Sequence, residues 1–98
     1  MNVLTIVTAN VDEGRAQELV AAFDALLAEG LPEGLLHTLL LGDGQGHWAI
    51  HSLWRDSAAL DAMRAAPAPP AAPALFRRFS GEPALLVMEV RADSGAQR

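Results

Sequence analysis

The order of apolar and polar positions along the chain predicts a strand followed by an amphipathic helix. Residues Val3–Val11 form a β-branched run with the composition of a strand. From residue 16 to residue 30, apolar side chains recur every three or four positions, which is the stripe of a helix that covers a core. Asp12 is placed to cap this helix, and Gly30 with Pro32 is placed to end it.

The middle of the chain predicts a hairpin and a second helix. Residues 34–41 and 46–54 are apolar runs that flank the segment GDGQG, whose three glycines permit positive φ angles and a tight turn. Asp56 or Ser57 can cap the helix that follows, with Leu60 and Met63 facing inward. Pro67 marks the end of this helix.

The last third of the chain alternates between proline-rich and apolar segments. Residues 67–74 read PAPPAAPA, which predicts a stiff extended loop. Leu75, Phe76 and Phe79 predict a single helical turn packed over the core. Residues 84–92 predict the final strand, so residues 1–93 form one domain and residues 94–98 a disordered tail.

Together these elements predict an α+β protein of order β-α-β-β-α-β. Right-handed crossovers place both helices on one face of a four-stranded antiparallel sheet, which is the ferredoxin-like arrangement. The first, second and last strands are apolar on both faces, whereas such a sheet normally has one wet face. We therefore expect a homodimer in which a second copy covers the face opposite the helices; an aggregation-prone monomer is the alternative.

Composition narrows the possible partners. Hydrophobic residues make up 51% of the chain, above the usual range of about 45–50%, which agrees with an additional apolar interface. The net charge of −5, without a basic cluster, argues against nucleic acid. No apolar run approaches the roughly 20 residues of a membrane span, and the N-terminus has no signal-peptide pattern, so we expect a cytoplasmic protein. Cysteine is absent, which excludes disulfides and thiolate chemistry.

The segment WAIHSLWRDSAALDAM (residues 48–63), anchored by Trp54, Asp56 and Leu60, resembles the antibiotic biosynthesis monooxygenase-like proteins of the dimeric α+β barrel superfamily. The resemblance covers essentially the whole chain in element order and length. It implies a pocket between sheet and helices and, in the cofactor-independent oxygenases, a Trp at the position of Trp54. The Asn that those oxygenases place four residues earlier is Ile50 in this chain.

The haem-degrading branch of the same superfamily implies a different set of residues. Asn10 matches the Asn that this branch places late in the first strand. Its Trp position falls at Met63, and its His would fall within residues 67–74, where the chain has none. The resemblance therefore predicts a protein that does not degrade haem, and we expect no cofactor.

Histidines are the candidate acid–base residues. If the hairpin is centred on Gly44, His37 lies directly opposite His51 on one face, close enough to share a proton or a substrate, with His47 further along. The alternative is that both are structural histidines bonded to backbone. A one-step shift of the turn would break the pairing. Zinc requires three or four protein ligands, so we expect no metal.

The remaining candidates are Trp54 and Asn10. Trp54 shares a strand face with Trp48, Ile50 and Ser52; we expect Trp48 in the core and Trp54 either in the core or as the aromatic wall of a pocket. Asn10 either caps a turn or donates a hydrogen bond to a substrate oxygen. Arg77 or Arg78, beside the proline-rich segment, is a candidate lid over an acidic substrate.

These residues lead to a functional hypothesis. A small aromatic phenol or quinol would be deprotonated by His51 or His37 and would react with dioxygen directly, with Trp54 and Asn10 orienting it. The alternatives are a non-catalytic module that binds a small molecule, and an isomerase or lyase acting on an acidic small molecule. The sequence does not identify a substrate.

Overall fold

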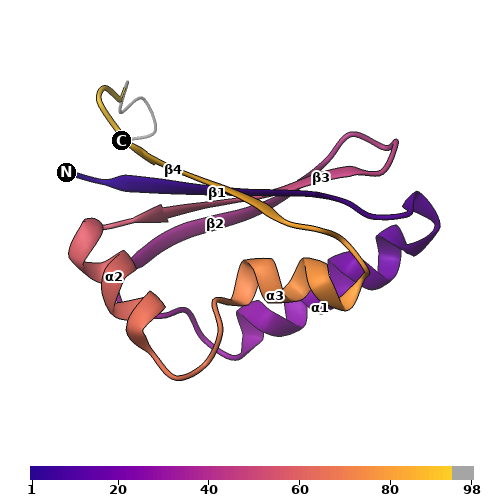
Figure 1. The fold of residues 1–98 in the computed structure, drawn as a ribbon, viewed down its shortest axis with the longest axis horizontal. Coiled ribbons are helices and arrows are strands. Elements are labelled where there is room, and N and C mark those ends of the chain that lie inside the picture. Colours follow the sequence, from indigo (N-terminus) through magenta and orange to yellow (C-terminus); the bar gives the residue numbers. More distant parts are fainter. Residues whose placement is uncertain (94–98) are drawn as a thin grey trace.

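A computed structural model describes residues 1–93 of the chain, and it confirms the predicted order of strands with one helix more than expected (Figure 1). The prediction of a disordered tail over residues 94–98 lies outside the described residues. The elements are β1 Val3–Asn10, a short 3₁₀ turn Glu13–Arg15, α1 Ala16–Ala28, β2 Leu35–Gly42, β3 His47–Trp54, α2 Ser57–Ala65, α3 Ala71–Arg78 and β4 Ala84–Glu89.

The four strands form one antiparallel sheet in the order β2-β3-β1-β4. Residues 1–93 contain three α-helices, and Figure 1 shows that they lie on one side of this sheet. This is the ferredoxin-like α+β architecture, and the placement of both crossover helices on one face is confirmed. The strands β2 and β4 are the two edges, and every residue of β4 is exposed.

Asp12 and Asp56 both act as side-chain caps, Asp56 at the start of α2 and Asp12 at the 3₁₀ turn that precedes α1. The Asp12 carboxylate accepts a hydrogen bond from the backbone N–H of Gly14, at the start of the turn that leads into α1. The Asp56 carboxylate accepts a hydrogen bond of 2.8 Å from the N–H of Ala59, which caps α2. Gly30, with a φ angle of +97°, follows the end of α1.

The prediction for residues 67–74 is wrong in its second half. Helix α3 begins at Ala71 and runs for two turns, instead of the single turn expected around Leu75. Pro73 lies in the first turn, where backbone N–H groups have no partner within the helix, so its missing donor is not needed there. Pro70 precedes the helix with the fixed φ angle of proline, and the chain before it forms bends at residues 66–68.

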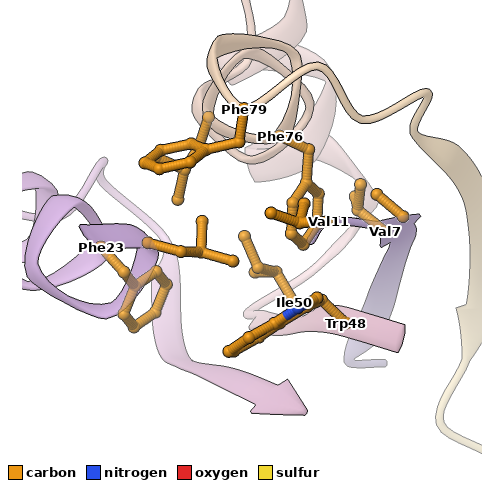
Figure 2. Packing of buried hydrophobic residues seen from close by; sticks show 10 residues of the cluster. Val7, Val11, Phe23, Trp48, Ile50, Phe76 and Phe79 are labelled. Atoms are coloured by element: carbon orange, nitrogen blue, oxygen red, sulfur yellow. The ribbon is translucent and has the colours of Figure 1, made fainter. Parts of the chain in front are cut away.

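The core consists of two groups of buried side chains between the sheet and the helices. The larger group joins α1 and α3 to β1 and β3, and Figure 2 shows Phe23, Phe76, Trp48 and Ile50 pointing toward one another within it. The smaller group joins α2 to the other end of the sheet through Val3, Trp54, Ala59 and Leu60. The sheet face between the two groups carries the candidate site.

Among the described residues, no helix is both long enough and apolar enough to cross a membrane. The cytoplasmic location expected from the sequence stays a prediction.

Candidate functional site

A cavity of about 250 Å³ lies between the sheet and the helices, where the sequence comparison with oxygenases implies a pocket. Its walls come from the C-terminal half of α1, from α2 and from the start of α3, and they are mainly apolar: Phe23, Leu26, Leu27, Leu60, Met63 and Pro70–Pro73. Its floor is the helix-facing side of the sheet. The cavity therefore separates the two groups of core residues.

Three small polar side chains cross the floor of the cavity in one row. Ser52 on β3 lies between Thr38 on β2 and Thr5 on β1, because it pairs with both of them in the sheet. Thr38 Oγ1 and Ser52 Oγ are 3.0 Å apart and form a hydrogen bond. Thr5 Oγ1 accepts a bond of 3.1 Å from Trp54 Nε1 and donates a longer bond of 3.4 Å to the Ser52 carbonyl oxygen.

Trp54 lines the cavity, as the resemblance to the oxygenases implies. Its side chain is buried, and its indole N–H is committed to Thr5. Ile50, at the position where those oxygenases carry Asn, also lines the floor. Trp48 lies in the larger core group, which confirms its predicted structural place.

The predicted pairing of His37 with His51 is wrong by one step of the hairpin. His51 lies opposite Leu39, and His37 lies opposite Leu53, so the two imidazoles are diagonal neighbours on the same face. The turn is centred on Gln45, not Gly44, because the Asp43 carboxylate accepts hydrogen bonds from the N–H groups of Gln45 and His47. These bonds set the register of the whole hairpin.

The histidines and Trp54 lie on opposite faces of the sheet. His51 pairs with Ile6 on β1, whereas the residues facing the helices, Ser52 and Trp54, pair with Thr5 and Val3. The expectation that His37, His51 and Trp54 meet in one pocket between sheet and helices is therefore wrong for a single chain. Side chains alternate between faces along a strand, and His51 and Trp54 are three positions apart on β3. This odd separation alone places them on opposite faces.

Asn10 lies on the same open face as the histidines, at the end of β1 and opposite His47. Both residues line a shallow, solvent-exposed groove near the hairpin, together with Asp43 and Glu82. His47 Nδ1 lies 2.6 Å from Asp43 Oδ2. The pKa of Asp43 is below its ordinary value because the backbone N–H of Gln45, and then the His47 side chain, donate to the carboxylate. This pair shapes the turn and is remote from the cavity.

Charged side chains reach the cavity at its mouth. Arg64, in the last turn of α2, and Glu29, just after α1, both line it. Arg77 and Arg78, which were the candidate lid residues, are exposed and do not line it. The segment Pro70–Pro73 does line it and supplies part of its cover.

Thr5, Thr38 and Ser52 were not among the candidate residues from the sequence. A signal exists for Thr5 and Ser52, because each is a polar residue whose neighbours two positions away on the strand are buried apolar side chains. Thr5 lies between Val3 and Val7, and Ser52 lies between Ile50 and Trp54. A polar position inside a buried stripe identifies either a satisfied core group or a ligand site.

No group of three or more His, Asp or Glu side chains suited to a metal ion occurs among residues 1–93.

The ferredoxin-like fold, with a mainly apolar cavity between its sheet and its helices, defines the class of protein as a small α+β domain. A model of the antibiotic biosynthesis monooxygenase family matches residues 2–72. The chain belongs to this family. None of the curated proteins compared with the chain matches it.

Solved structures share this fold over almost the whole chain. The heme-degrading protein Rv3592 from Mycobacterium tuberculosis is 26% identical, with 97% of this chain and 100% of that chain covered at a TM-score of 0.70. SnoaB from Streptomyces nogalater, described as a cofactor-independent oxygenase, is 15% identical, with 96% and 97% covered at a TM-score of 0.69. Rv0793 from Mycobacterium tuberculosis is 17% identical, with 97% and 100% covered at 0.69.

The residues around the cavity do not fit a haem group. All three histidines of the chain lie outside the cavity lining, and His37 and His51 are on the other face of the sheet. Asn10, which matches the haem-degrading branch by position, also lies on that other face. The histidine that this branch places after the second helix is absent from residues 67–74. The described residues of this cavity therefore offer haem no histidine ligand.

Proposed function

We propose that the protein binds a small aromatic phenol or quinol in the cavity between sheet and helices and allows it to react directly with dioxygen, without a cofactor. The observation that carries this proposal is an apolar cavity with a short polar row on its floor and Trp54 in its lining, in a member of the antibiotic biosynthesis monooxygenase family. The similarity to SnoaB, a cofactor-independent oxygenase, supports the same class of reaction.

The apolar walls bury the flat ring of the substrate, and the floor orients its oxygen atom. Dioxygen is small and apolar, so it enters the same environment without a specific site. Oxidation of a naphthol to a naphthoquinone balances as one naphthol and one dioxygen giving one naphthoquinone and one water. The substrate anion supplies the electrons, and one oxygen atom of dioxygen is transferred to the ring while the other leaves as water.

The proton of the substrate leaves through the mouth of the cavity. Glu29 is the one carboxylate among the described residues that line the cavity, and it is exposed there. We propose Glu29 or solvent as the acceptor for chemistry in the cavity. His37, His51 and Asn10 stay candidates for a role on the open face of the sheet, and His51→Ala tests that role separately.

Oxygen uptake in the presence of naphthols and anthrones tests the proposal. Wild-type protein should consume oxygen with at least one of these compounds, and Trp54→Phe should lower the rate by about tenfold or more, because the ring loses its position against the wall. Trp48→Phe is the matched control, since Trp48 is also buried on the helix side but belongs to the core. Absence of uptake with every compound sinks the oxygenase proposal, and equal rates in the two variants place the chemistry elsewhere.

A second candidate is a module that binds the same class of molecule without catalysis. The enclosed cavity favours binding in either case, and the absence of imidazole from its described lining favours this second candidate. Thermal-shift measurements with the same compounds distinguish the two. Ligands that raise the melting temperature without being oxidised support the binding module.

We also propose that the protein is a homodimer joined through the open face of the sheet. The exposed apolar side chains of this face include Leu39 and Leu41 on β2 and Leu86 and Met88 on β4. Exposed apolar side chains on both edge strands of one sheet face are typical of an interface between copies. Gel filtration with light scattering tests the dimer.

A further inference from the structure

The hydroxyl groups on the floor of the cavity leave one donor without an acceptor. Thr38 and Ser52 together carry two O–H groups, and the single hydrogen bond between Thr38 Oγ1 and Ser52 Oγ uses one of them. Whichever hydroxyl accepts this bond still has its own O–H to donate. Among the described residues, no further bond is made by either hydroxyl.

The neighbouring polar groups of the floor do not share this property. Trp54 Nε1 donates to Thr5 Oγ1, and Thr5 donates its own hydroxyl proton to the Ser52 carbonyl oxygen. The unused donor therefore belongs to the pair formed by Thr38 and Ser52, which we name the hydroxyl pair. Ser52 is only 7% exposed, and both residues of the hydroxyl pair line the cavity.

A buried hydroxyl with no acceptor lowers stability, so an apolar side chain of similar size would suit a purely structural floor better. The rows on either side of the hydroxyl pair are apolar where they cross the same strands: Leu40 lies opposite Ile50, and Leu35 lies opposite Trp54. The hydroxyl pair, with Thr5 beside it, thus forms a polar row between apolar rows on the floor of the cavity. A ligand oxygen that accepts the free O–H accounts for this arrangement.

We infer that the hydroxyl pair is the recognition site for the oxygen atom of the ligand, and that it restricts the cavity to small flat aromatic molecules carrying a phenol, phenolate or ring carbonyl oxygen. The inference rests on the proposed function, because it concerns the same cavity. The volume of about 250 Å³ lies just below the usual range of roughly 300–1,000 Å³ for ligand sites, which favours a small ring system.

The hydroxyl pair also contributes to the proposed oxidation. When the substrate is an anion, its negative charge resides largely on the oxygen that faces the hydroxyl pair. A hydroxyl donor aimed at that oxygen in a water-poor cavity stabilises the anion that reacts with dioxygen. Thr38 and Ser52 therefore determine both which ligand is bound and which of its ionisation states is favoured.

Binding measured without oxygen tests the hydroxyl pair apart from catalysis. Isothermal titration under argon compares 1-naphthol with 1-methylnaphthalene, which has the same rings and a methyl group in place of the hydroxyl. The measured quantity is the ratio of the two dissociation constants. In the double variant Thr38→Val/Ser52→Ala, the advantage of 1-naphthol should fall by about tenfold relative to wild type, while 1-methylnaphthalene binds as well or better.

Thr8→Val is the matched control. Thr8 is on β1 like Thr5, but it is exposed and faces away from the helices, so its loss should leave the ratio unchanged. If the double variant does not fold, the single variants Thr38→Val and Ser52→Ala replace it, and each should lower the ratio less than tenfold because one hydroxyl remains.

Three results overturn the inference: no binding of 1-naphthol to wild type, an unchanged ratio in the double variant and both single variants, or an equal change in Thr8→Val. These outcomes differ from failure of the proposed function. If the wild-type protein discriminates between the two ligands but consumes no oxygen, the oxygenase proposal is contradicted and the role of the hydroxyl pair still stands. If the double variant oxidises 1-naphthol at the wild-type rate and shows the wild-type ratio of dissociation constants, only the role of the hydroxyl pair is contradicted.

Discussion

Gly30 and Gly34 have similar backbone conformations, with φ angles of +97° and +85°, but different surroundings. A Cβ atom added to Gly34 would lie 2.4 Å from the Ala59 Cβ atom, whereas one added to Gly30 would have nothing within 4 Å. At Gly34, the segment that leads into β2 therefore packs closely against α2. The pair separates the cost of backbone strain from the cost of a steric clash.

We expect Gly34→Ala to lower the free energy of unfolding by about 1–3 kcal/mol more than Gly30→Ala, because both variants share the left-handed strain and only the first is overpacked. Urea denaturation of the two variants and wild type measures the difference. Equal losses would mean that α2 moves away at little cost and that the contact with Ala59 is not tightly packed.

At the scale of elements, the end of α3 contains a residue that its backbone geometry does not favour. The N–H of Gly81 donates to the Phe76 carbonyl and the N–H of Ser80 donates to the Arg77 carbonyl, which is a Schellman motif. The left-handed position of this motif is Ser80, with a φ angle of +63°, where glycine is the usual residue.

Ser80→Gly should raise the free energy of unfolding by about 0.5–1 kcal/mol, since it relieves the left-handed strain at the cost of some backbone entropy. Differential scanning calorimetry should show a melting temperature a few degrees higher. Ser80→Ala keeps the strain and serves as the control. If Ser80→Ala raised the free energy of unfolding by as much, the effect would come from loss of the hydroxyl group and not from relief of strain.

The cap of α2 makes the stability of that helix dependent on pH. The N–H of Ala59 donates to the Asp56 carboxylate and holds its pKa below the ordinary value. The folded state therefore binds this proton less readily than the unfolded state does. The stabilisation is complete above the ordinary aspartate pKa of about 3.9 and is lost as the pH falls through the lower value of the folded state.

Asp56→Asn keeps a capping oxygen and removes the titration, so the stability of this variant should fall less than that of wild type below about pH 4. Urea denaturation over a series of pH values measures both curves. The pKa of Asp43 is also lowered, and Asp43 is unchanged in this variant, so part of the loss of stability at low pH should persist. Parallel curves for the two proteins would contradict the role of Asp56.

The elements were predictable because their signals are local. The stripe of α1 and the cap at Asp56 each lie within a few residues of sequence, and the structure confirms them. The sequence prediction missed the first turn of helix α3, because its prolines were read as a sign of an extended loop. The first turn of a helix nevertheless tolerates proline. Local rules compete there, and the packing of Leu75 and Phe76 into the core decides the outcome.

The site was less predictable, because its composition depends on the register and faces of the whole sheet. A turn centred on Gln45 in place of Gly44 changes every partner across the hairpin, and the hydrogen bonds of Asp43 that fix this centre are not evident from glycine content. Parity along β3, however, is readable from sequence. It separates His51 from Trp54 and places Ser52 beside Trp54, which is how the cavity floor is built.

At the scale of the whole molecule, adjacent residues of β4 distinguish the two faces of the sheet. Leu85 and Leu86 are each 50% exposed, but Leu85 faces the helices and lines the cavity, whereas Leu86 lies on the open face opposite Ile6. A charge at Leu86 would be buried without a partner if a second copy covers the open face, and desolvating it would strongly oppose association. The same charge at Leu85 would leave that face unchanged.

We therefore expect Leu86→Glu to be a monomer under conditions in which wild type and Leu85→Glu are dimers, as measured by light scattering after gel filtration at micromolar concentration. Loss of the dimer in Leu86→Glu alone assigns the interface to the open face and places His37 and His51 within it. A wild-type monomer would overturn the proposed dimer. Dimers in all three proteins would move the interface to another surface, and the histidines would then face solvent as they do in the single chain.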